Sequence, residues 1–172
     1  MASNSRSPWG RAVPLMIAGP AAIGAALGLN AQAQAQAGPV AALSCAAILT
    51  AIIVGTWASM LPALYIGAAF MGVAPRAQAV ARSAGAALGD MGLIFLGLAP
   101  PFLFLVASST QGVTVRALGY VVVSAGVALG LRALFVRLFD GRSLKALGLF
   151  AGWSLVSVGI GASLFERMVP LP

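Results

Sequence analysis

The most constraining feature of this sequence is a run of 35 residues, from Val40 to Ala74, that contains no charged side chain. At 1.5 Å per residue such a run would make a helix of about 52 Å, longer than the roughly 30 Å hydrocarbon core of a bilayer. The chain as a whole is 60% hydrophobic and only 8% charged. Because this leaves too little polar surface for a water-soluble globule, we expect an integral membrane protein.

Four further apolar runs are each long enough to cross a bilayer. The predicted spans are 12–29, 40–61 with a continuation to 74, 84–107, 113–136 and 146–165. Residues 30–38, in which alanine and glutamine alternate, are expected to form a short external loop. No soluble domain or long linker is evident, so the sequence predicts a single all-α transmembrane domain over 1–172, a compact bundle of about five helices.

The cationic residues predict the orientation of the bundle, because lysine and arginine favour the cytoplasmic side. If the second run crosses once, eight cations face the cytoplasm with the N-terminus: Arg6, Arg11, Arg76, Arg82, Arg132, Arg137, Arg142 and Lys145. Two, Arg116 and Arg167, then lie outside. The surplus length after Pro62 is expected to be a kinked continuation that is either buried against other helices or re-entrant.

The N-terminal segment also fits a second interpretation. A basic start, an apolar run and Ala-x-Ala triplets describe a secretory signal peptide that would be cleaved near 33–37, which would remove residues 1–37. We favour retention, because the run of about 18 residues exceeds the roughly 7 to 15 of a signal core. The arginine-rich, alanine-rich and glycine-rich composition is typical of GC-rich bacterial genomes, so the predicted location is a bacterial inner membrane.

Four runs contain a small-xxx-small (GxxxG) motif, which places two glycines on one helix face and lets another backbone approach closely. The pairs are Gly24 and Gly28, Gly85 and Gly89, Gly126 and Gly130, and Gly148 and Gly152. For each pair we expect helix packing within the chain. Association with another subunit is the alternative for any one of them.

Asp90 is the single acidic residue inside an apolar run. Charged groups at membrane depth are costly, so a functional proton or cation site is one hypothesis. The favoured interpretation is a helix N-cap at the interface, or a pairing with Arg82. Pro100 and Pro101 lie farther along the same run, where they remove backbone donors and predict a helix kink, as Pro62 does in the second run.

The residue inventory gives little support to catalysis. The chain has no histidine, one cysteine (Cys45) and three acidic residues far apart in sequence. We therefore expect no enzyme, cofactor or metal site and no nucleic-acid partner. The leading hypothesis is a non-catalytic structural or accessory subunit or scaffold of a larger inner-membrane assembly, partnered by another membrane protein or by a second copy. The alternative is a small transporter or channel that uses Asp90 and the kinked third helix.

Overall fold

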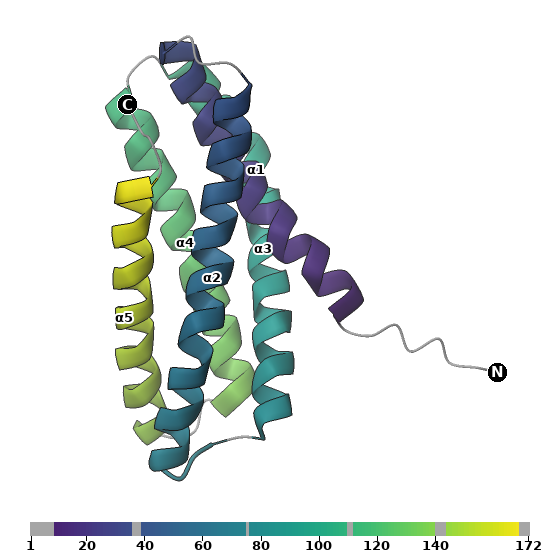
Figure 1. Ribbon diagram of the computed structural model, residues 1–172, viewed down its shortest axis with the longest axis vertical. Coiled ribbons are helices and arrows are strands. Elements are labelled where there is room, and N and C mark those ends of the chain that lie inside the picture. Colours follow the sequence, from purple (N-terminus) through teal and green to yellow (C-terminus); the bar gives the residue numbers. More distant parts are fainter. Residues whose placement is uncertain (1–8, 36–38, 75, 110–111, 140–143, 169–172) are drawn as a thin grey trace, which may run out of the picture.

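The computed structural model describes residues 9–35, 39–74, 76–109, 112–139 and 144–168, which form five long helices (Figure 1). They are α1 (Trp9–Ala35), α2 (Val40–Phe70), α3 (Ala77–Ser108), α4 (Gly112–Phe139) and α5 (Leu144–Met168). The part of the chain that the structure describes contains no strand. All five helices are long and apolar enough to span a membrane. The prediction of an all-helical, multi-pass chain is confirmed to that extent.

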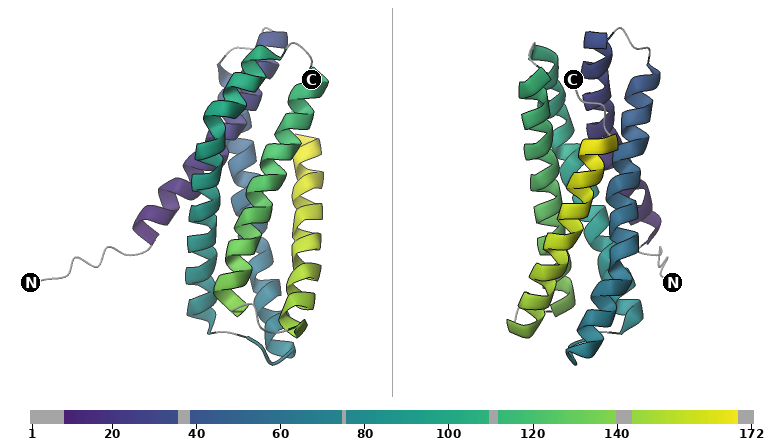
Figure 2. Two further views of the ribbon diagram at one scale, coloured as in Figure 1. Left: turned by 180° about the vertical axis from the view of Figure 1, so that it is seen from behind. Right: turned by 60° about the vertical axis from the view of Figure 1, so that its left-hand side comes forward.

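The helices run alternately up and down along the bundle (Figures 1 and 2). The N-terminal half of α1 leans away from the other helices and crosses α3 at an angle (Figure 2). Arg6, Arg142 and positions 36–37 of the predicted cleavage region lie outside the described residues.

Two helices extend beyond the segments that hydrophobicity predicts. The alternating segment expected as a loop over 30–38 is helical as far as Ala35, because alanine and glutamine are both good helix formers. The third helix begins at Ala77 rather than at 84, so it includes the polar turns around Gln78 and Arg82. In both cases the hydrophobic pattern marked the apolar stretch, whereas helical structure extends beyond it.

The segment after Pro62 was left as either a helix extension or a re-entrant loop, and the structure continues α2 through it to Phe70. The helix ends there because Gly72 adopts a left-handed conformation with φ of 69°. The backbone N–H of Val73 donates to the carbonyl of Ala68 at 2.9 Å, which closes the last turn. The expectation that this segment is buried is wrong for part of it, since Phe70 is 88% exposed.

The first three helices are held together by close backbone contacts at glycines. At the crossing of α1 and α3, Gly19 and Gly92 lie so close that a Cβ on either would clash with the other helix's backbone. Gly24 of α1 faces α2, where a Cβ would lie 2.5 Å from the carbonyl oxygen of Cys45. A Cβ on Gly28 would likewise lie 2.5 Å from the Cα of Ala42. These contacts match the close approach expected of the first small-xxx-small motif.

The second and third motifs also face the interior, although they meet different groups. Gly85 and Gly89 are both buried in α3, and a Cβ on Gly89 would lie 3.3 Å from Ala12 of α1. On α4, Gly126 makes room for the ring of Phe95 and Gly130 for the side chain of Met91. The latter two glycines therefore accept side chains of α3 rather than its backbone.

Candidate functional site

Helix α5 is joined to the bundle mainly through α2, by two tryptophans. The indole N–H of Trp153 donates to the backbone carbonyl of Met60 on α2 at 2.7 Å. Trp57 meets Trp153 edge to face, with ring centroids 6.4 Å apart, and both side chains are buried. This satisfies the polar indole group in an otherwise apolar contact and fixes the middle of α5 against α2.

Aromatic pairs connect α5 to α4 near both of its ends. Near the C-terminus of α5, Tyr120 packs edge to face on Phe165 with centroids 5.2 Å apart. Near the N-terminus of α5, Phe150 lies 5.2 Å from Phe135 and 6.3 Å from Phe139. Between these contacts the two helices oppose each other with shorter side chains, so the aromatic pairs act as spacers that hold α4 and α5 apart.

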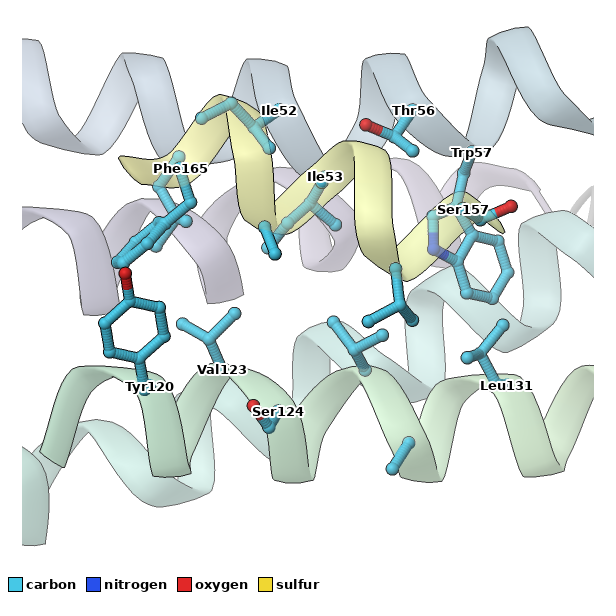
Figure 3. A pocket seen from close by; sticks show the side chains of 16 residues that line it. Ile52, Ile53, Thr56, Trp57, Tyr120, Val123, Ser124, Leu131, Ser157 and Phe165 are labelled. Carbon is cyan, nitrogen blue, oxygen red and sulfur yellow. The ribbon is translucent and has the colours of Figure 1, made fainter. Parts of the chain in front are cut away.

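The space between the spacers is a cavity of about 340 Å³, bounded by α2, α4 and α5 (Figure 3). Its walls are mostly aliphatic, with Ile52 and Ile53 on α2, Val123 and Leu131 on α4, and Val158 on α5. This volume and apolar lining fall in the range that is typical of small-molecule sites. Ala128, Val158 and Ala162, which line the cavity, are exposed, so it opens on the surface of the bundle.

A few hydroxyl groups interrupt the apolar lining. Ser157 donates to the carbonyl of Trp153 within its own helix at 2.8 Å, and Ser124 lines the α4 wall (Figure 3). Thr56 on α2 also lines the cavity, and its hydroxyl is buried without a hydrogen-bond partner. The hydroxyl of Ser154 on α5 is likewise buried without a hydrogen-bond partner. These hydroxyl groups do not indicate a particular reaction, because the described residues place no acid or base beside them.

Two charged residues lie just beyond one end of the cavity. The hydroxyl of Tyr120 donates to Oε1 of Glu166 at 3.2 Å, which joins α4 to the last turn of α5. Arg116 lies one turn before Tyr120 on α4 and is exposed. The cation and the carboxylate therefore stand at the same end of the two helices that bound the cavity.

The fourth small-xxx-small motif faces away from both contacts of α5. A Cβ on Gly148, Gly152 or Gly159 would meet no atom within 4 Å, and all three glycines are exposed. With 3.6 residues per turn they share one face to within roughly 20°. Trp153 and Phe165 lie more than about 90° away around the same helix. The expectation that every motif packs within the chain thus does not describe Gly148 and Gly152.

Asp90 is placed differently from the favoured sequence interpretation. It lies 13 residues after the first residue of α3, so it is no N-cap, and Arg82 bonds instead to Gln78 of its own helix at 3.5 Å. Its partner is Arg137 of α4, with Nη2 at 2.5 Å from Oδ2. Because side chains lean toward the N-terminus of their helix, those of two antiparallel helices lean toward each other, which brings this pair together.

Sequence reasoning missed three features of this region. Gly19 and Gly92 make the closest helix crossing but belong to none of the four predicted motifs. Arg137 was used only to predict the orientation of the bundle in the membrane. The cavity depends on aromatic residues that lie far apart in sequence, and the only available signal was the recurrence of small residues in the apolar runs of α4 and α5.

Pro62, Pro100 and Pro101 all lie inside continuous helices.

Comparison with known proteins adds no further information: no family model, no curated protein and no solved structure matches this chain significantly.

Proposed function

We propose that the chain is a non-catalytic accessory subunit or scaffold of a larger assembly in a bacterial inner membrane. In this proposal the face of α5 that bears Gly148 and Gly152 is the association face. It binds a transmembrane helix of another membrane protein or of a second copy. The cytoplasmic side is the one that bears Arg76, Arg82 and Lys145, in keeping with the distribution of cations.

The observation that carries the proposal is the contrast between the motif on α5 and the other three. The motif glycines of α1 and α4, and Gly89 of α3, lie against backbone or side chains of this chain, whereas Gly148 and Gly152 face outward with nothing in contact. Glycines on a lipid-facing surface give up helix propensity and gain no packing. A second helix placed against them would gain dispersion and weak Cα–H···O contacts, which drive association where the hydrophobic effect between helices is absent.

The uneven packing of the bundle supports the same proposal. In the first span 44% of the residues are buried inside the structure, against 17% in the fourth span and 17% in the fifth. Helices α4 and α5 are therefore the least buried of the five. Leu155, which lies on the glycine face of α5, is 77% exposed.

The test is association of a variant in which that face is made bulky. The double variant Gly148→Leu/Gly152→Leu should fold, since nothing lies within 4 Å of either position. After extraction in mild detergent it should run as a single chain, while the wild type runs as a complex. Gly97→Leu is the matched control, because Gly97 is equally open but lies on α3. A wild type that is itself a lone monomer, or a double variant that stays in the complex, contradicts the proposal.

One observation favours the alternative function of a small transporter or channel. Asp90 lies well inside a long apolar helix, and its carboxylate is bonded across to another helix. Ionisable pairs at such positions are used in proton relays. If Asp90 carries protons or cations, Asp90→Asn should abolish ion movement in reconstituted vesicles while helix content is kept. Ion movement that is absent from the wild type, or unchanged in Asp90→Asn, removes this alternative.

A further inference from the structure

The cavity between α2, α4 and α5 has the length of a single hydrocarbon chain in one leaflet. On α4 it extends from Tyr120 to Leu131, and 11 residues at 1.5 Å correspond to about 16 Å. Half of the hydrocarbon core of a bilayer is about 15 Å. The cavity volume of about 340 Å³ is therefore arranged as a slot parallel to the helices rather than as a compact chamber.

The slot is kept open by pairs of aromatic side chains at its two ends. Tyr120 and Phe165 at one end, and Phe135 and Phe150 at the other, separate α4 from α5 by the width of their rings. Between them Ala128 and Ala162 are too short to fill the gap, and both are exposed. A flexible apolar chain can enter sideways from the bilayer, whereas a helix about 10 Å wide is too broad for a slot of this volume.

The charges at the Tyr120 end indicate the headgroup. Arg116 lies four residues before Tyr120, one turn beyond the cavity on α4, and Glu166 directly follows the cavity-lining Phe165 on α5. The hydrogen bond from Tyr120 keeps the Glu166 carboxylate at this end. An arginine binds a phosphate well through charge-assisted hydrogen bonds, and a carboxylate does the same for an ammonium group. Arg116 and Glu166 thus offer one partner to each charge of a zwitterionic headgroup, while Arg167 lies about 160° away from Phe165 around α5.

We propose that the slot binds one acyl chain of a zwitterionic phospholipid, with the phosphate on Arg116 and the ammonium group on Glu166. The site goes beyond the proposed association function, because its cavity lies between α2, α4 and α5, whereas Gly148 and Gly152 face outward with nothing in contact. The bound chain fills the gap between α4 and α5 and makes this side of the bundle rigid.

Native mass spectrometry of the protein in mild detergent, with added phosphatidylethanolamine or phosphatidylglycerol of equal chain length, tests the site. The wild type should retain one phosphatidylethanolamine and bind it about tenfold more tightly than phosphatidylglycerol. Glu166→Gln should remove that preference, whereas Arg116→Gln should weaken the binding of both lipids, because both carry the phosphate. Arg132→Gln is the matched control, since Arg132 is an exposed cation near the opposite end of the cavity, and it should behave as the wild type does.

The chain-binding part is tested separately with Ala128→Phe/Ala162→Phe, which places two rings in the slot. This variant should retain no lipid while keeping wild-type helix content, because both positions are exposed. The proposal is overturned if the wild type retains no lipid or binds phosphatidylglycerol equally well. It is also overturned if Arg132→Gln has the effect expected of Arg116→Gln, or if a second copy of the chain rather than lipid is lost from the filled variant. If the filled variant does not fold, the Arg116, Glu166 and Arg132 variants decide.

Discussion

The two sides of this bundle use small residues in opposite ways. On the α1–α3 side, Gly19 and Gly92 bring two backbones into direct contact, and no side chain fits between them. On the α5 side, Gly148 and Gly152 touch nothing, and α5 is attached instead through the rings of Trp153 and Phe150. Glycine thus marks a finished contact on one side of the bundle and an open face on the other. Which one it marks depends on residues elsewhere in the fold.

The largest effect should come from adding one methyl group at the α1–α3 crossing. In Gly92→Ala the new Cβ would clash with the backbone carbonyl of Leu15, which cannot move as a flexible side chain can. Overpacking of this kind costs about 1 to 3 kcal/mol, and more where backbone must shift. The free energy of unfolding in mixed micelles of mild detergent and SDS should fall by at least that amount.

The same substitution on the other side sharpens the contrast. Gly152→Ala meets no atom within 4 Å and also gains helix propensity, so the free energy of unfolding should be unchanged or slightly higher. If the two substitutions cost the same, the two sides are packed alike and the comparison fails.

A smaller effect is expected from the ion pair that joins α3 to α4. Asp90→Asn and Arg137→Gln should each lower the free energy of unfolding, because the remaining charge loses its partner in an apolar setting. The double variant should cost less than the sum of the two. Double-mutant cycles of polar contacts in membrane proteins give on the order of 1 kcal/mol. A coupling energy of zero would show that the two side chains do not interact.

An effect similar in size to that of the ion pair should follow the removal of a single hydrogen bond from α5. Trp153→Phe keeps a ring against Trp57 but loses the bond from the indole N–H to the Met60 carbonyl. The expected cost is about 0.5 to 1.5 kcal/mol. Trypsin or another protease should then cleave near Lys145 faster than in the wild type, as α5 separates more often. Unchanged stability and unchanged cleavage would mean that α5 is held by contacts other than this one.

Much of the fold could be predicted from hydrophobic patterning alone, because a helix in lipid satisfies its own backbone hydrogen bonds. The five runs and their order follow from that rule. The end of α1 and the start of α3 do not follow from it, because Ala35 and Ala77 lie in polar stretches whose helical structure comes from propensity rather than apolar character. The continuation of α2 past Pro62 was likewise left open by the sequence.

The candidate site was much less predictable. Asp90 stood out as the lone intramembrane acid, but its partner Arg137 is 47 residues away and is brought to it only by the antiparallel packing of α3 and α4. The cavity depends on the spacing that Tyr120 and Phe165 impose between two helices. No local pattern reports such a distance. The glycines of α5 were recognised, whereas their outward direction follows from where α2 and α4 lie.

The most direct test of the account is site-specific cross-linking in native membranes. In a Cys45→Ala background, single cysteines at positions 152 and 97 would be labelled with a thiol-reactive photo-cross-linker, which inserts into C–H bonds of any neighbouring chain on illumination. Both positions are open in the structure, so lipid exposure alone would treat them alike. The account predicts a cross-linked species, either a second copy or a heavier partner, from position 152 and none from position 97. Equal yields from both positions, or none from position 152, would contradict the assignment of α5 as the association face.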